Sequence, residues 1–301
     1  MGEYSKRIGQ IGENVVEDFL KMIGWTNLQK NFDIKSINPE KHLKGSHGID
    51  AFFHYRSPMV SGLIENVIIS SKYSTKSYST NPIKDFKDYY FDLATAIESF
   101  KLSEMRQKTM VNHEGYDNYV DRGVLFWLNN SEESYDDLIS KLAHIDLPKD
   151  LSNEGIFLVD NKRIVFIYDS IRFALSTFRD SDVDFIYFST GLNNDETNFR
   201  NGKIMPIQYI NASILPIRIQ KQAETIVLIS SINEFDEGEL LKIMGLAKNI
   251  GCNVQGSTIL CFPDYSESKH EPIVSNLKQA FNDSSFTNRL TVSNYNSPIL
   301  R

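Results

Sequence analysis

The chain has 301 residues, of which 41% are hydrophobic and 24% are charged, and its formal net charge is −7. This composition is that of a soluble globular protein, and no apolar run approaches the roughly 20 residues of a membrane span. The first residues lack the apolar region of a secretory signal, and the two cysteines, Cys252 and Cys261, have no CxxC spacing. We therefore expect a reduced cytoplasmic protein with no membrane partner.

The acidic charge is unevenly placed along the chain. Residues 1–90 contain 12 Lys or Arg against 10 Asp or Glu, whereas residues 91–301 contain 20 against 29. An acidic protein can still bind nucleic acid where its site is locally basic, so the N-terminal part is the better candidate for a polyanion-binding surface. A solvated face of mixed charge is the more common explanation for such an asymmetry.

The first 130 residues predict a helix, three strands, a second helix and a fourth strand. Apolar residues at helical spacing end at Gly24, and two apolar runs separated by a turn with Pro58 and Gly62 predict a hairpin. The predicted elements are a helix at Ile8–Ile23, strands at Asn27–Ile34, Asp50–Tyr55 and Leu63–Ser71, a helix from Ile83 to about Met110, and a buried strand at Gly123–Leu128.

The rest of the chain predicts a mixed region followed by a parallel α/β unit, because strands and helices alternate near the C-terminus. We divide the chain into a core at 1–130, a mixed α/β extension at 131–220 and a C-terminal α/β unit at 221–301 that contacts a partner or regulates. The predicted elements are a helix at Tyr135–Leu142, a hairpin at Gly155–Tyr168, an extended segment at Ile204–Ile219, strands at Ile226–Ser230 and Thr258–Phe262, and helices at Asp236–Ile250 and Glu271–Phe281.

The hairpin of residues 47–73 contains the candidate catalytic residues. It brings Asp50, at the start of its first strand, to the same end of the sheet as Lys72. Residues two apart on a strand face the same way, so Ser70 and Lys72 share a face, which we expect Asp50 to border. A carboxylate beside a lysine can hold Mg²⁺ and position a water near a phosphate. From the spacing alone, a strand-end salt bridge is the more common explanation of such a pair.

The order of these elements, with Gly12–Glu13 on the helix, Ile49–Asp50 on the first hairpin strand and Lys72 on the second, resembles the PD-(D/E)xK nuclease superfamily. This resemblance implies a restriction-endonuclease-like α-β-β-β-α-β core. It assigns catalysis to Glu13, Asp50 and Lys72, and a Mg²⁺ or Mn²⁺ ion to Asp50, Glu13 and the position of Ser70. The chain departs from the pattern at Ser70, where the family has Glu or Asp.

The implied function is metal-dependent hydrolysis of DNA in bacterial defence or restriction, by a homo-oligomer or together with a second protein subunit. Lys44, His47, Arg56 and Lys76 are candidates to line a nucleic-acid groove, although a solvated face explains them nearly as well. One alternative is a catalytically inactive pseudo-nuclease that binds nucleic acid or serves as a structural subunit, since Ser70 lacks the metal-binding acid. A third hypothesis places a small-molecule sensor in the C-terminal unit, but no sequence motif supports it.

Overall fold

The computed structural model describes residues 2–113, 115–116, 118–130, 138–148, 151, 154–192, 200–222, 224–251 and 256–296, with the backbone alone for 2–10 and 251. The chain forms two compact units, Met1–Ile164 and Val165–Arg301, and the boundary falls within α6 (Asn161–Thr177). The boundary between these units does not coincide with the domain boundaries expected at residues 130 and 220. The division into core, extension and C-terminal unit stays a prediction. Cys252 and the first residues of the helix expected at Tyr135–Leu142 lie outside the described residues.

The first unit is built on a five-stranded sheet of order β1-β2-β3-β4-β5. Strands β1, β2 and β3 are antiparallel neighbours, whereas β3, β4 and β5 run parallel. The expected α-β-β-β-α-β core is confirmed by α1, the first three strands, α3 and β4. The elements are α1 (Gly2–Met22), β1 (Gln29–Lys35), α2 (Pro39–His42), β2 (Ser46–Arg56), β3 (Leu63–Ser74), α3 (Ile83–Phe100), α4 (Glu104–Asn112), β4 (Asn118–Asn129), α5 (Leu138–Lys141) and β5 (Ile156–Val159).

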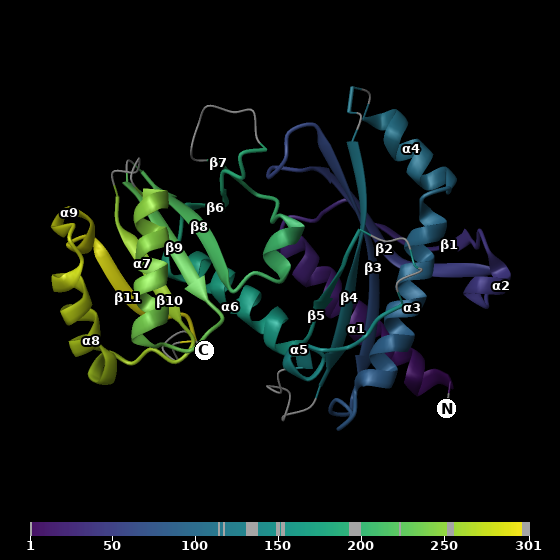
Figure 1. Cartoon of the computed structure of the whole chain (residues 1–301), viewed down its shortest axis with the longest axis horizontal. Coiled ribbons are helices and arrows are strands. Elements are labelled where there is room, and N and C mark those ends of the chain that lie inside the picture. The colour runs from purple at the N-terminus through teal and green to yellow at the C-terminus, as the bar shows by residue number, and fades with distance from the viewer. Residues whose placement is uncertain are drawn as a thin grey trace. The chain divides into compact units, whose positions relative to one another are not determined.

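Helices α1 and α3 cover opposite faces of this sheet (Figure 1). On β4, Phe126 meets Phe19 of α1 with ring centroids 5.8 Å apart, whereas Leu125 and Trp127 belong to the core cluster that includes Leu93 of α3. Successive residues of a strand point to opposite faces, so each helix packs on its own side. Residues on the central strands are therefore assigned to the α1 face or the α3 face.

Two predicted elements of the first unit are wrong in detail, and a polar helix cap explains each difference. The helix expected to reach Met110 ends at Phe100, and α4 begins after Ser103, whose hydroxyl accepts a hydrogen bond from the backbone N–H of Arg106 at 3.2 Å. The hairpin expected at 155–168 is instead β5 followed by α6. Asp160 accepts from the N–H of Arg163 at 2.8 Å, so the polar residues after β5 start a helix.

The second unit contains a six-stranded sheet of order β11-β10-β9-β8-β6-β7. Strands β9, β10 and β11 are parallel, which confirms the α/β unit expected near the C-terminus. Its core packs α7 and α8 with these strands. The elements after α6 are β6 (Asp182–Tyr187), β7 (Arg200–Gly202), the 3₁₀ helix η1 (Ile207–Ile210), β8 (Ile214–Lys221), β9 (Glu224–Ser231), α7 (Glu237–Gly251), β10 (Thr258–Phe262), α8 (Glu267–Ala280), α9 (Ser284–Thr287) and β11 (Leu290–Asn294).

Within the described ranges, no helix combines the length and the apolar character needed to cross a membrane.

Candidate active site

The regular alternation of side chains along β2 breaks at Asp50. Ile49 and Phe52 both pack in the core cluster on the α3 face, although residues three apart on a regular strand face opposite ways. Between them, Asp50 and Ala51 both line a pocket against α1. The strand therefore carries a local irregularity that turns the Asp50 carboxylate toward α1.

The neighbouring strand β1 is irregular at the same level. Asn31 has φ = 50°, in the left-handed region that asparagine tolerates better than most residues. In the pairing of β1 with β2, Lys30 pairs with Ala51 and Phe32 pairs with Ile49, and the pair between Asn31 and Asp50 is missing. As a result Lys30 and Asn31 both line the pocket against α1.

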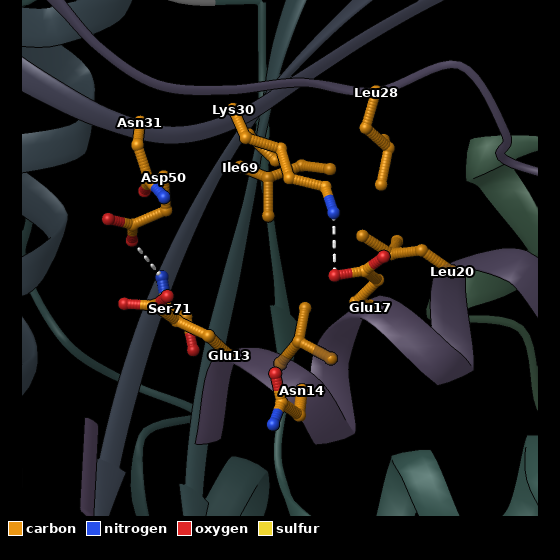
Figure 2. A pocket seen from close by; sticks show the side chains of 12 residues that line it. Glu13, Asn14, Glu17, Leu20, Leu28, Lys30, Asn31, Asp50, Ile69 and Ser71 are labelled. Atoms are coloured by element: carbon orange, nitrogen blue, oxygen red, sulfur yellow. Dashed lines mark hydrogen bonds and ion pairs between the residues drawn. The ribbon is translucent and has the colours of Figure 1, made fainter. Parts of the chain in front are cut away.

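We call this hollow the Asp50 pocket. Its volume is about 190 Å³, which exceeds the roughly 10–15 Å³ that one water molecule requires, so it has room for a hydrated ion. Helix α1 and strands β1, β2 and β3 all contribute to its walls, as Figure 2 shows. Its polar lining includes Glu13, Glu17, Lys30, Asn31, Asp50 and Ser71.

A backbone hydrogen bond fixes the orientation of Asp50. Its Oδ2 accepts from the N–H of Ser71 on β3 at 2.6 Å (Figure 2). This bond ties β2 to the C-terminal part of β3 and leaves the second carboxylate oxygen without a hydrogen-bond partner among the described residues. A charged acceptor bound to a backbone donor makes a strong hydrogen bond, so Asp50 is held with one oxygen available for a cation.

Glycine at position 12 brings Glu13 to the pocket. A Cβ atom added to Gly12 would lie 2.4 Å from Cβ of Tyr73, a separation that real side chains essentially never show. Only glycine therefore allows α1 to approach β3 this closely. The neighbouring Glu13 is an exposed residue that lines the Asp50 pocket from α1, as the resemblance implied (Figure 2).

A third carboxylate of the pocket, Glu17, is paired with two lysines. It lies 2.6 Å from Nζ of Lys30 and 2.9 Å from Nζ of Lys21. The hydrogen bonds from Lys30 and then Lys21 lower the pKa of Glu17 from 4.5 to about 2. Glu17 is thus an ion-pair partner, which leaves Glu13 and Asp50 as the carboxylates that could bind a cation.

Carboxylate oxygens are ligands of the kind that Mg²⁺ or Mn²⁺ binds. Over the described part of the chain, no group of three or more His, Cys, Asp or Glu side chains could hold a metal ion. Mg²⁺ is commonly bound by one or two carboxylates, with water and phosphate oxygens as the other ligands. Asp50 and Glu13 supply that number of carboxylates.

Ser70 and Lys72 line a different pocket, which we call the Lys72 pocket. Lys44, His47 and Asp92 also line it. The Nζ of Lys72 lies 5.5 Å from the ring centroid of Tyr89, which belongs to α3. The expectation that Asp50, Ser70 and Lys72 share a face is therefore wrong, because the irregularity at Asp50 reverses the face of that one residue. The roles predicted for Ser70 in metal binding and for Lys72 in catalysis are not tested by this placement.

The four candidate nucleic-acid contacts do not form one surface. Lys44 forms an ion pair with Asp92 at 2.6 Å. His47 is buried, its ring nitrogen lies 3.1 Å from that of His42, and burial lowers the pKa of its imidazole.

The other two basic candidates lie at opposite ends of the β2–β3 pair, because each is at the C-terminal end of its strand and the two strands are antiparallel. Arg56 ends β2, six residues and therefore about 20 Å along the strand from Asp50, and its guanidinium carbon lies 5.0 Å from the Tyr116 ring centroid. Lys76 is exposed just after β3, where its backbone N–H donates to Ser74 Oγ at 3.0 Å.

Residues 1–163, just over half of the chain, match the family model described as the GAPS4 protein PD-(D/E)XK nuclease domain. The chain belongs to this nuclease family. The match covers α1, all five strands of the first sheet and both pockets, which confirms the superfamily resemblance. Nucleases of the PD-(D/E)XK type generally use divalent metal ions, in agreement with the paired carboxylates. No curated protein matches the chain.

Sequence reasoning missed Lys30, Asn31 and the backbone N–H of Ser71 as parts of the site. Lys30 fell inside the strand expected at Asn27–Ile34, and strict alternation would place it on the same face as Phe32. The asparagine at position 31 is a weak signal, since Asn is enriched among residues with positive φ. A search for such residues opposite a motif acid could have identified the irregularity.

Proposed function

We propose that this nuclease hydrolyses phosphodiester bonds of DNA and requires Mg²⁺ or Mn²⁺ held by Asp50 and Glu13. The observation that carries the proposal is the meeting of these two carboxylates, from β2 and α1, in one pocket of a PD-(D/E)XK nuclease domain. When bound, the cation would supply positive charge to the phosphate that undergoes hydrolysis.

The reaction is a displacement at phosphorus. A water oxygen forms a bond to phosphorus, the bond from phosphorus to a sugar oxygen breaks, the water releases a proton to solvent and the leaving oxygen takes one up. The backbone N–H of Ser71 orients the carboxylate of Asp50, and the close approach of α1 to β3 positions Glu13. The predicted contacts of Lys44, His47, Arg56 and Lys76 with the nucleic acid belong to the same proposal.

The test is cleavage of supercoiled DNA, linear DNA and RNA by the purified full chain, with Mg²⁺, with Mn²⁺ and with EDTA. Asp50→Asn and Glu13→Gln should lower the rate by at least about 10-fold to 100-fold and weaken Mn²⁺ binding in titration calorimetry. Asp18→Asn is the matched control, since Asp18 lies on the same helix with 81% of its side chain exposed.

Two outcomes count against the proposal. Cleavage that survives both substitutions contradicts the assignment of the site. DNA binding without cleavage under every metal condition supports the pseudo-nuclease alternative instead, for which the serine at position 70 is the motivating residue.

We also propose that the protein serves in bacterial defence or restriction, as a homo-oligomer or with a second protein subunit. Membership of the nuclease family supports a role of this kind. Phage plating on cells that express the wild type or Asp50→Asn tests the role, and light scattering of the purified chain tests self-association. Equal plating efficiency on the two strains would contradict the defence role.

A further inference from the structure

The Asp50 pocket contains a lysine outside the sequence motif. Lys30 lies on β1, and it is the only lysine or arginine among the described residues that line this pocket. Its Nζ lies 2.6 Å from Oε2 of Glu17, and 40% of its side chain is exposed (Figure 2). The ammonium is therefore both held in place and accessible from solvent.

The ion pair with Glu17 leaves hydrogen-bond donors of Lys30 available to an anion. A lysine ammonium carries three N–H donors, and Oε2 of Glu17 accepts from one of them. The other lysine partner of Glu17, Lys21 at 2.9 Å, is itself also paired with Asp18 at 3.6 Å. Glu17 remains ionised at neutral pH, because its lysine partners lower its pKa to about 2. An anion entering the pocket thus meets the ammonium of Lys30 beside the carboxylates.

Two adjacent positions fix Lys30 relative to Glu13 and Asp50. Glu17 follows Glu13 by four residues on α1, which is a rise of about 6 Å along the helix. On the sheet, Lys30 pairs with Ala51, the residue after Asp50. The ammonium is consequently anchored in the wall of the pocket that both candidate metal ligands also line.

The lysine of the sequence motif is placed differently. Lys72 packs over Tyr89 on the α3 face and lines the Lys72 pocket with Lys44. Between the two pockets lies the sheet itself. Reaching the Asp50 pocket would require Lys72 to pass to the other face of β3.

We infer that Lys30, rather than Lys72, is the lysine of this active site, and that its ammonium contacts a nonbridging oxygen of the phosphodiester and stabilises the negative charge that develops there. Glu17 is a positioning residue that holds Lys30. The inference rests on the proposed nuclease function, which supplies the phosphodiester substrate. Lys30 forms and breaks no covalent bond in this role.

The experiment compares Lys30→Met, Lys30→Arg, Lys72→Met and the matched control Lys21→Met, which removes the other lysine partner of Glu17. Three quantities are measured on the full chain: the single-turnover rate of DNA cleavage, the affinity for a 5′-phosphorylated dinucleotide with Ca²⁺ present, and the affinity for Mn²⁺. Removing one group that stabilises transition-state charge should lower the rate of Lys30→Met by about 100-fold. Its dinucleotide affinity should fall by about 5-fold, the size expected for one partly exposed ion pair.

Lys30→Arg keeps the positive charge, so it should recover part of the cleavage rate and part of the dinucleotide affinity. Lys21→Met should match the wild type. None of the substitutions should change the Mn²⁺ affinity. Loss of cleavage in Lys72→Met with cleavage retained in Lys30→Met overturns the inference. If the wild type does not cleave, the proposed function fails and the dinucleotide measurement alone decides the role of Lys30. A wild type that does not bind the dinucleotide, or a Lys30→Met variant that binds it equally well, then overturns the inference.

Discussion

The substitution Gly12→Ala should separate α1 from β3 and lower nuclease activity more than it lowers stability. The added Cβ would lie 2.4 Å from Cβ of Tyr73, whereas ordinary contacts begin at 3.4 Å, so the two elements must separate by about 1 Å. Cβ of Tyr73 is fixed to the backbone of β3, and rotation of the side chain cannot relieve the clash. Glu13 is the next residue of α1 and must move with the helix.

The stability change follows from two opposing terms. Overpacking of a well-packed contact costs about 1–3 kcal/mol, and replacing glycine by alanine within a helix recovers about 1 kcal/mol. The expected net loss is about 0–2 kcal/mol. A displacement of about 1 Å at an active site can by contrast lower a rate about 100-fold.

The stability measurement uses the intrinsic fluorescence of the chain, since its two tryptophans, Trp25 and Trp127, are both buried in the first unit. Gly245→Ala is the control, because Gly245 lies within α7 and a Cβ added there meets nothing within 4 Å. It should retain the wild-type cleavage rate. Adding Tyr73→Gly to Gly12→Ala removes the clashing atom and should restore part of the activity. Equal cleavage rates in Gly12→Ala and Gly245→Ala would refute the reasoning.

Three further predictions concern the irregular strand, an ion pair and a thiol. Asn31→Val should lower the free energy of unfolding by about 1–2 kcal/mol and weaken Mn²⁺ binding, because valine tolerates positive φ poorly. Asn31→Gly should have neither effect. Chemical denaturation measures the stability, and titration calorimetry measures the Mn²⁺ affinity. Glu17→Gln should lower the melting temperature at pH 7. The folded-state pKa of Glu17 is lowered from 4.5 to about 2, so the stability that its ion pairs contribute is present above about pH 4.5 and is lost toward pH 2. The melting temperatures of wild type and Glu17→Gln should therefore converge toward pH 2. A difference in melting temperature that stays constant with pH would contradict this. Cys261 is fully buried and burial raises the pKa of its thiol, so in a Cys252→Ser background it should react with Ellman's reagent only after unfolding.

Much of the fold was predictable because its signals are local. The apolar runs of the hairpin and the polar turn between them predicted β2 and β3, and alternating strands and helices predicted the parallel strands of the second unit. The errors fell where one signal has two meanings. Asp160 and Asn161 are typical of a turn between strands, but here Asp160 caps a helix.

The site was only partly predictable from the sequence. Glu13 and Asp50 were identified, and the structure places both in one pocket. The prediction that Ser70 and Lys72 lie on the same face as Asp50 was wrong, because it assumed the strict alternation of a regular strand. A change of face at a single residue depends on backbone dihedral angles in two neighbouring strands, and no property of Asp50 itself encodes it.

The paired irregularity at Asn31 and Asp50 has a consequence for how distant relatives of this nuclease are detected. A sequence comparison that requires a fixed spacing between the acid and the lysine of the hairpin matches Lys72 of this chain to the motif lysine. Lys72, however, lines a different pocket from Asp50. Relatives with the same distortion could lose that lysine without losing the positive charge of the pocket, as long as β1 retains a lysine at the equivalent of position 30. Profiles that weight β1 together with the hairpin should therefore separate active members from inactive ones better than the short motif does.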